Sequence, residues 1–240
     1  MREELPPPLP PAERTVGQLL AESMRLYGQR FWNALPLGLP LGVVDQATLG
    51  QDAGVRIVVF AAGAPLLAAS YTVASALAAR TKLDRRAAAI AITTGTLVLL
   101  PASLLMVWFA LLAAAYLALV GLVVPVAVVE RRGPLDAFRR AGDLARADFV
   151  HAFGALAALA VVFFIARIGL VALLQAQAEN TVRAAVLLAD VALGPLLFLG
   201  AALLYFDQEA RLSARPRASR IRTRARHRQG SVRSVKSRKG

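Results

Sequence analysis

The chain of 240 residues contains no cysteine and only two histidines. The absence of cysteine excludes disulfide bonds, thiolate chemistry and metal sites with cysteine ligands, and His151 and His227 leave almost nothing for a histidine-based site. Phosphate-binding loops, paired catalytic carboxylates and serine-elbow motifs are also absent from the sequence. We therefore expect no catalytic residues, no cofactor and no bound metal, and we expect that the protein is not an enzyme.

Charged residues are scarce, at 18% of the chain, whereas hydrophobic residues make up 57%. The mean hydropathy is +0.56, yet the formal net charge is +13, from 28 Lys and Arg against 15 Asp and Glu. A soluble globular protein has no reason to be this apolar, and a disordered chain lacks such hydrophobicity. The composition predicts an all-α, polytopic membrane protein whose charges are concentrated in a few segments.

Stretches without Asp, Glu, Lys or Arg locate the predicted crossings, because a charge at the bilayer centre is costly and about 20 residues span the hydrocarbon. Ile57 to Ala79 and Ala184 to Phe206 each fit one crossing. Ala87 to Val129 would extend about 64 Å as a single helix, twice the hydrocarbon thickness, so it must fold back into two crossings. Pro101 is the favoured position for the reversal, although any turn from Gly95 to Trp108 fits.

Two further stretches fit a crossing less simply. Phe149 to Leu174 is long enough, but Arg167 interrupts it. Phe31 to Val44 is short and contains Pro36 and Pro40, so it is either a kinked crossing or a re-entrant segment. We favour a crossing on the charge argument below, which gives a bundle of about six transmembrane helices.

The basic residues predict the orientation. With six crossings, 25 of them lie on the side that holds both termini, and only Arg56 and Arg183 lie on the other. This asymmetry predicts cytoplasmic termini, and omitting the first crossing would put the N-terminal arginines on the wrong side. Residues 1 to 14 lack the apolar core of a cleavable signal peptide. The bias toward Ala, Leu and Arg suggests a GC-rich bacterial genome, so we expect a multi-pass protein of the bacterial inner membrane.

The remaining segments divide the chain into three parts. Residues 1 to 14 predict a disordered, proline-rich arm, residues 15 to 210 a helical transmembrane domain, and residues 211 to 240 a disordered basic tail. Thr15 and Gln18 have the spacing of a capping box and begin an amphipathic helix. Its apolar stripe either lies on the inner membrane interface or packs on the cytoplasmic loops of the protein. The stripe comprises Val16, Leu19, Leu20, Met24, Tyr27 and Phe31.

A second interfacial amphipathic helix is predicted after Glu130, with Pro134 at its first position. Its arginines either form a solvated face, paired with neighbouring aspartates, or contact anionic lipid headgroups. These candidate headgroup contacts are Arg131, Arg132, Arg139, Arg140 and Arg146. The tail contains twelve basic and no acidic residues, so it should bind polyanions, with anionic lipid ranked first. It lacks aromatic residues for base stacking, which argues against sequence-specific nucleic-acid binding.

Two formally charged residues fall within the predicted crossings, Arg167 and Asp190. Both lie in the outer part of the bilayer, so they can form an intramembrane ion pair. Such a pair is a functional candidate. It can also simply hold two helices together, and an arginine can reach the interface with its long side chain.

The sequence resembles the bacterial membrane domain that is sometimes fused to glycerophosphoryl diester phosphodiesterases, and its stand-alone relatives. The resemblance covers roughly residues 15 to 212 and rests on the opening TVGQLLAESMRLYGQRFW, on a junction motif and on the ending LLYFDQEARL. The matching positions are Pro125, Glu130, Gly133, Ala137, Phe138, Arg139 and Arg140, followed by Leu204, Tyr205, Phe206, Asp207 and Arg211. Ala141 replaces the usual serine, and the hydrolase domain is missing. The resemblance implies a multi-pass helical membrane protein rather than a phosphodiesterase.

The favoured function is a non-enzymatic integral membrane protein, a scaffold or accessory factor that contacts anionic lipid or a protein partner through its cytoplasmic basic segments. The alternative is a carrier or channel for a small or lipid-like solute, which would use Arg167, Asp190 and the proline-kinked helices. A membrane-embedded enzyme of lipid metabolism has no nameable acid, base or nucleophile cluster. The sequence does not define an oligomeric state.

Overall fold

We analysed a computed structural model that describes residues 10–174 and 176–237, with side chains described at all of these except 106–108, 110 and 215–237. All regular structure in the described residues is helical. The elements before the first long helix are η1 (Pro11–Glu13), α1 (Val16–Gln29), α2 (Phe31–Ala34), η2 (Leu35–Gly38) and α3 (Leu39–Thr48). They are followed by α4 (Ala53–Ala79), α5 (Arg85–Trp108), α6 (Ala110–Val120), α7 (Val123–Val129), α8 (Pro134–Ala145), α9 (Phe149–Leu174) and α10 (Glu179–Ser237).

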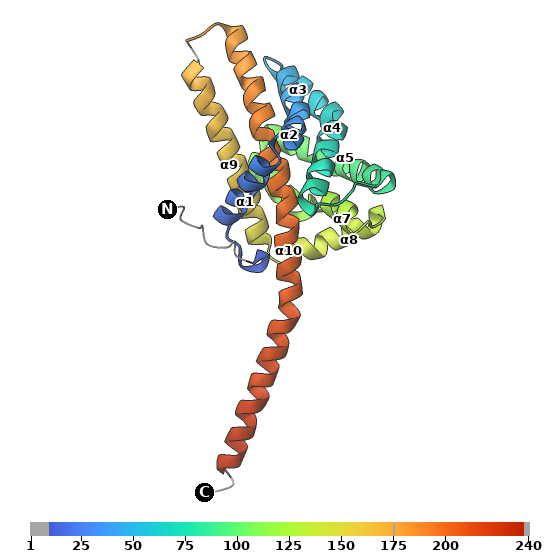
Figure 1. The fold of residues 1–240 in the computed structure, drawn as a ribbon, viewed down its shortest axis with the longest axis vertical. Coiled ribbons are helices and arrows are strands. Elements are labelled where there is room, and N and C mark those ends of the chain that lie inside the picture. Colours follow the sequence, from blue (N-terminus) through green and yellow to red (C-terminus); the bar gives the residue numbers. More distant parts are fainter. Residues whose placement is uncertain (1–9, 175, 238–240) are drawn as a thin grey trace.

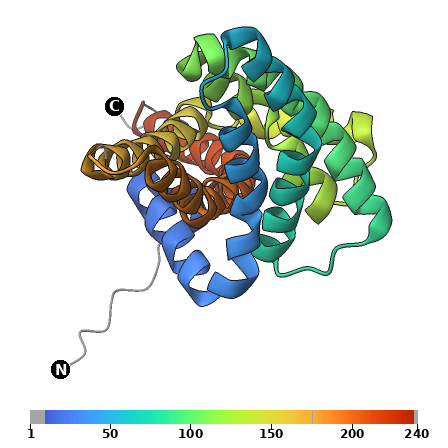
Figure 2. The ribbon, with the colours of Figure 1, turned by 90° about the horizontal axis from the view of Figure 1, so that it is seen from above.

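In the part of the chain that the structure describes, five helical segments are long and apolar enough to cross a membrane. They are Ala53–Ala79, Arg85–Leu105, Leu111–Val129, Phe149–Leu174 and Glu179–Ala214. The α10 helix lies against most of the other elements (Figure 1). Seen from above, α9 and α10 lie side by side at one edge of the bundle, and α4 and α5 occupy the other (Figure 2). This arrangement is consistent with a multi-pass membrane protein.

The predicted crossing Phe31 to Val44 is not one of the five long helices. Pro36 and Pro40 lie in the first turns of η2 and α3, where a missing backbone donor is tolerated. The two prolines therefore divide the segment into α2, η2 and α3, which follow one another almost without interruption. The sixth crossing stays a prediction.

The reversal inside residues 87 to 129 does not lie at Pro101. Pro101 sits within α5, and the helix ends at Phe109, whose backbone leaves the helical region with φ −143° and ψ 73°. A proline inside a transmembrane helix is tolerated because neighbouring groups satisfy the freed backbone carbonyl. The fold-back into two helices, each long and apolar enough to span a membrane, is confirmed, but its turn lies one residue beyond the predicted range.

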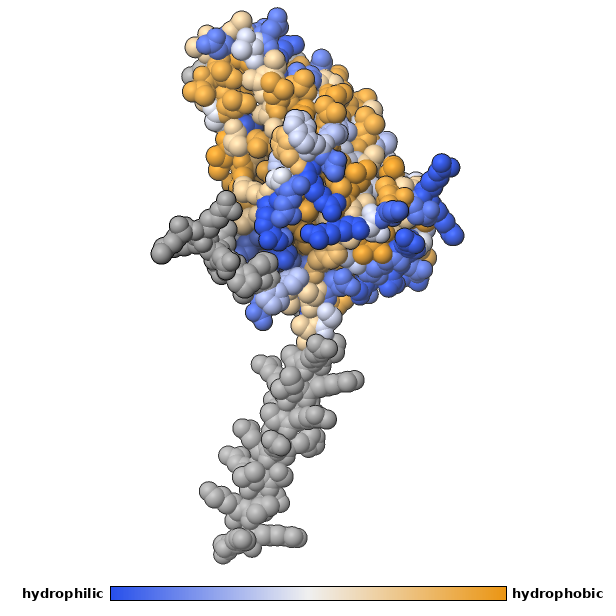
Figure 3. Space-filling view, in the orientation of Figure 1, coloured by the Kyte–Doolittle hydropathy of each residue, from blue (hydrophilic) through white to orange (hydrophobic). Residues whose placement is uncertain are grey.

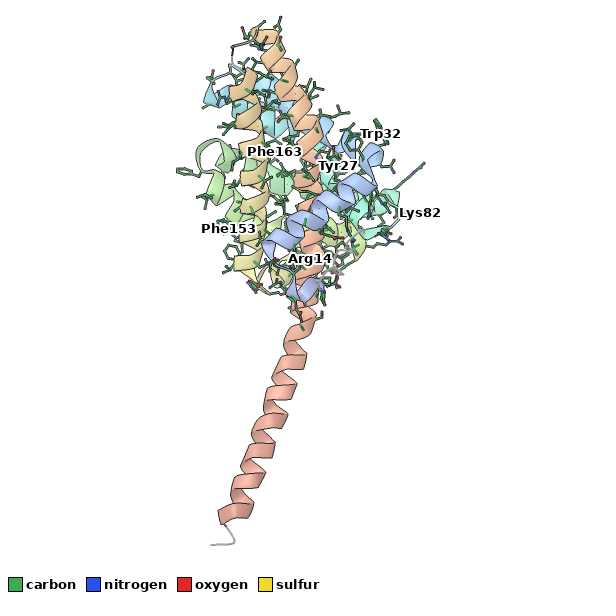
Figure 4. All side chains as sticks on the ribbon, turned by 60° about the vertical axis from the view of Figure 1, so that its left-hand side comes forward. Arg14, Tyr27, Trp32, Lys82, Phe153 and Phe163 are labelled. Atoms are coloured by element: carbon green, nitrogen blue, oxygen red, sulfur yellow. The ribbon has the colours of Figure 1, made fainter. Side chains whose placement is uncertain are left out.

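Helix α1 begins with the predicted capping box. The Thr15 hydroxyl accepts a hydrogen bond from the Gln18 backbone, and the Gln18 side chain accepts one from the Thr15 backbone. The helix lies obliquely across α9 and α10 (Figure 4) and buries Leu19, Ser23 and Leu26. Of the predicted apolar stripe, Leu19 is buried, whereas Met24 and Phe31 are exposed, so a contact of the exposed part with the membrane interface stays a prediction. The helix thus packs on membrane-spanning helices rather than on cytoplasmic loops.

Glycines allow the segment from η2 to α3 to approach α10 closely. A Cβ atom at Gly38 would lie 2.2 Å from the Val191 carbonyl oxygen, and one at Gly42 would lie 2.8 Å from a methyl group of Leu187. On α10, Gly194 lies opposite, with its Cβ position 3.1 Å from the Gly38 Cα. Small residues spaced four apart bring helices together in lipid, where packing replaces the hydrophobic driving force.

The folded domain extends beyond both of its predicted boundaries, at residues 15 and 210. The arm ends in the short helix η1 and in Arg14, which is buried, so residues 11–14 belong to the folded domain. At the other end, Arg211 and Leu212 also pack on the body and extend the domain past residue 210. Residues 1–9 lie outside the described residues, as do the side chains after Ala214 on α10. The predicted disorder of residues 1–9 stays a prediction. Helix α10 continues to Ser237, so the described backbone of residues 211–237 is helical where the sequence predicted a disordered tail.

Candidate functional site

Arg167 on α9 and Asp190 on α10 lie close together, with the Arg167 Nε atom 3.4 Å from the Asp190 Oδ1 atom. The structure adds Asp45 of α3, whose carboxylate accepts a hydrogen bond from the Arg167 guanidinium. We call Arg167, Asp45 and Asp190 the intramembrane triad. One guanidinium therefore bridges carboxylates from two other helices, which fixes the relative positions of α3, α9 and α10.

The glycine contacts described above explain how Asp45 reaches the triad. Gly42 lies one turn before Asp45 and packs on α10, and the Gln46 amide donates a hydrogen bond of 2.9 Å to the Arg183 carbonyl oxygen. Sequence reasoning missed Asp45 because this residue directly follows the charge-free stretch Phe31 to Val44. It was used only as the boundary of the predicted crossing and was not considered as part of a site. The spacing of Gly38 and Gly42 was the available signal, since it predicts a close helix contact just before Asp45.

The three side chains of the intramembrane triad differ in their exposure and in their hydrogen bonds. The Asp190 side chain is 1% exposed, whereas those of Arg167 and Asp45 are 21% and 16% exposed. Neither carboxylate oxygen of Asp190 has a hydrogen-bond partner among the described residues. A buried carboxylate without hydrogen bonds is costly, and such groups concentrate at functional sites in membrane proteins. The arrangement can hold helices together, and it can also bind a proton donor or a cation next to Asp190.

A second charged network surrounds Asp207, near the middle of α10. Asp207 is fully buried, and its carboxylate accepts a hydrogen bond of 2.9 Å from Arg14, at the start of α1 (Figure 4). His151 of α9 places its Nε2 atom 3.5 Å from the other Asp207 oxygen. Arg211 donates hydrogen bonds of 2.7 Å to Asp148 and to the Arg14 carbonyl oxygen. The network ties the start of the chain to the last spanning helix.

Glu130, which directly follows α7, is the centre of a third cluster. Its carboxylate accepts hydrogen bonds from Arg132, from Arg140 at 3.0 Å and from the Tyr205 hydroxyl at 3.0 Å. Burial alone would raise the pKa of Glu130, but the hydrogen bonds from Arg140, Arg132 and Tyr205 outweigh it and hold the pKa below its ordinary value. The same contact raises the pKa of Arg140, against the effect of its burial. The junction motif and the ending motif therefore meet in this cluster.

The five predicted headgroup contacts separate into two groups. Arg132 and Arg140 pair with Glu130, and the Arg140 side chain is only 24% exposed. Arg131, Arg139 and Arg146 are exposed. Arg139 lies 3.8 Å from Asp136 on the protein surface, and the Arg131 and Arg146 side chains have no ion pair within the described part of the chain. Arg132 is also exposed, but its guanidinium is paired with Glu130, so Arg131, Arg139 and Arg146 are the three of the five that do not pair with this glutamate. The contact of all five with lipid stays a prediction.

Comparison of the chain with protein-family models, with curated proteins and with solved structures finds no match. The resemblance to the phosphodiesterase-associated membrane domain therefore rests on the sequence motifs alone. Among the side chains that the structure describes, no three histidine, aspartate or glutamate residues gather to hold a metal ion. The candidate sites are thus the intramembrane triad and the basic surface near α8.

Proposed function

We propose that the protein is a non-enzymatic, multi-pass membrane protein that contacts anionic lipid headgroups through a basic surface at its cytoplasmic end. In this role it acts as a scaffold or accessory factor in the inner membrane of a bacterium. The observation that carries the proposal is the gathering of exposed arginines and exposed apolar side chains on and beside α8. Such a mixture is typical of a surface at the level of lipid headgroups.

The basic surface draws on two segments. Arg131, Arg139 and Arg146 extend from α8 and the turn before it, next to Leu135, which is 64% exposed. The second segment, between α4 and α5, lies at the same end, because α5 and the α6–α7 pair are consecutive antiparallel crossings. Its exposed basic residues are Arg80, Lys82, Arg85 and Arg86. Figure 3 shows hydrophilic side chains at the lower end and lower right of the body, below a largely apolar surface, and Lys82 points outward in Figure 4.

Six crossings with both termini in the cytoplasm are part of the proposal. The Arg14 contact with Asp207 joins the start of the chain to the inner end of α10, and the Gln46 contact with Arg183 joins the end of α3 to its outer end. The 24 residues of α10 between these contacts rise about 36 Å as a helix, more than the hydrocarbon thickness. The chain from Arg14 to Gln46 thus runs the whole length of a spanning helix, which supports a sixth traverse.

Topology can be tested directly because the chain has no native cysteine. We would place single cysteines at Glu13, Lys82, Arg183 and Ser213 and label intact cells with a membrane-impermeant maleimide. The proposal predicts external labelling at Arg183 alone. Labelling of Glu13 but not Ser213 from outside would support five crossings and contradict the proposed orientation.

Lipid contact can be tested in membranes extracted with their own lipids. The full chain and a variant with Arg131, Arg139 and Arg146 changed to glutamine would be isolated in polymer-bounded discs from bilayers of mixed phosphatidylcholine and phosphatidylglycerol. We expect phosphatidylglycerol to be enriched around the full chain, and the enrichment to fall with added salt and in the variant, because each arginine contributes roughly 1 kcal/mol. The double variant Arg56→Gln and Arg183→Gln is the matched control, because these two arginines lie on the proposed external side of the bundle. Equal enrichment in all three proteins would argue against the basic surface.

A carrier for a lipid-like solute is the second candidate, favoured by the hydrogen-bond-free Asp190 carboxylate inside the bundle. It predicts that the intact protein accelerates the movement of a fluorescent short-chain phospholipid across vesicle membranes, and that Arg167→Ala and Asp190→Ala remove the acceleration while the protein stays folded. No acceleration by the intact protein would count against this candidate.

A further inference from the structure

An apolar cavity of about 270 Å³ lies within the bundle. Side chains from α4, α5, α6, α9 and α10 surround it, for example Phe60, Leu99, Leu117, Phe164 and Phe198. The cavity exists because facing helices contribute small residues where large ones would fill the space. Each of five helices contributes at least one of these, and they are Ala64, Ala102, Ala113, Ala114, Ala160 and Ala201.

The cavity offers almost nothing to a polar ligand. The two side-chain hydroxyl groups on its wall, those of Tyr71 and Ser103, already donate to the carbonyl oxygens of Ala201 and Leu100 at 3.3 and 2.6 Å. Water needs several polar partners to occupy a cavity, and apolar cavities stay dry and accept apolar molecules. The wall therefore selects for hydrocarbon.

The position of the cavity indicates the source of that hydrocarbon. Nearly all of its wall comes from the five membrane-spanning segments, and the triad residues Asp45 and Arg167 lie one helical turn past the wall residues Leu41 and Phe164. Helix α9 forms one side of the cavity, and only 11% of its most apolar stretch is buried in the protein. Wall residues such as Phe60 and Phe164 keep partial exposure. Acyl chains are the apolar molecules that surround these helices in a bilayer.

We propose that this cavity binds one alkyl chain of a membrane phospholipid. The chain restores the dispersion contacts that the small residues leave unmade, and its binding does not depend on the basic surface at the cytoplasmic end. The cavity thus gives the protein a site for the hydrophobic part of a lipid, separate from the proposed headgroup contacts.

The test uses the full chain in vesicles that contain a phospholipid with a photoreactive diazirine near the end of one acyl chain. After illumination, mass spectrometry locates the covalent adducts. We expect adducts on cavity residues of α9 and α10, such as Leu159 and Leu197. Adducts restricted to lipid-facing residues such as Val161 and Ile165, which are 52% and 65% exposed, would overturn the proposal.

Two variants place a large side chain on different helices of the cavity wall, Ala160→Phe on α9 and Ala114→Phe on α6. Each should reduce the cavity adducts by roughly tenfold, since a large side chain takes the place of the bound methylenes. Ala166→Phe on the exposed face of α9 is the matched control and should leave them unchanged. A variant is included only if its gel-filtration elution volume and its unfolding temperature match those of the parent protein. One such cavity-filling variant is enough for the test. Unchanged cavity adducts in a folded filled variant would contradict the proposal.

A photoreactive free fatty acid forms the second arm of the experiment. Weaker labelling of the cavity by the fatty acid than by the phospholipid is the expected result. Stronger labelling by the fatty acid would overturn the assignment to a phospholipid chain. Loss of headgroup enrichment in the arginine variant, with cavity adducts retained, would show that the two sites are separate.

Discussion

Arg14 and Asp207 form a buried ion pair of 2.9 Å between residues 193 positions apart in the chain. The Asp207 side chain is completely buried and that of Arg14 is 11% exposed, so neither charge is well hydrated. The pair anchors the residue before the N-cap of α1 to the middle of α10. Because the contact is so distant in sequence, it constrains how the N-terminal segment lies along the bundle.

Replacing Arg14 with alanine should destabilise the protein by about 3 kcal/mol, because it leaves the Asp207 carboxylate buried without its main partner. The unfolding midpoint in detergent is the measurement. Arg25→Ala removes an arginine from an exposed pair with Glu22 and should cost less than about 1 kcal/mol. Asp207→Asn combined with Arg14→Ala should recover part of the loss. Equal effects of the two single arginine variants would show that the Asp207 site is hydrated.

Acid should weaken the fold through Glu130. Its folded-state pKa lies below the ordinary value of 4.5, so its contribution to stability is complete above that pH and is lost as the pH falls through the lower, folded-state pKa. We expect unfolding temperatures measured at about pH 6 and about pH 3.5 to differ more for the parent than for Glu130→Gln, which has no carboxylate to protonate. An identical pH dependence in both proteins would show that Glu130 contributes no such term.

Gly38 should tolerate no larger residue. Gly38→Ala places a methyl group 2.2 Å from the Val191 carbonyl oxygen, and a backbone atom cannot move aside as a flexible side chain can. We expect a loss of roughly 1 to 3 kcal/mol from displacement of η2 and α3. Gly28→Ala is the control, because its Cβ position has no neighbour within 4 Å and alanine favours the helix. A neutral Gly38→Ala would mean that η2 does not touch α10 this closely.

Features encoded locally could be predicted from the sequence. The capping box at Thr15, the start of α8 at Pro134 and the fold-back within residues 87 to 129 depend on neighbouring residues or on length, and the structure contains all three. The turn at Phe109 could not be predicted, because lipid-embedded helices accept a proline such as Pro101 and the break depends on tertiary packing.

Contacts between residues far apart in the chain are the main feature that the sequence did not predict. Asp45 and His151 each contact charged residues more than 50 positions away in the chain, in networks built by three elements. A single sequence carries no distance information between such segments. The sequence placed Asp207 in the ending motif, directly after the last charge-free stretch, but it gave no sign that Arg14, 193 positions earlier, is its partner.

The stability of the intramembrane triad should depend on which member is removed. Arg167→Ala leaves two carboxylates without their shared cation, one of them completely enclosed by the protein, and should cost about 3 to 5 kcal/mol. Asp45→Asn or Asp190→Asn leaves the guanidinium with one carboxylate, so each should cost less. A variant with Arg167→Met, Asp45→Asn and Asp190→Asn carries no charge there and should be more stable than Arg167→Ala alone, because burying a neutral amide costs much less than burying an unpaired carboxylate. Unfolding in detergent and in lipid discs provides the comparison. If Arg167→Ala unfolded at the parent temperature in both media, water would reach the carboxylates, and a role for the triad in holding α3, α9 and α10 together would have to be abandoned.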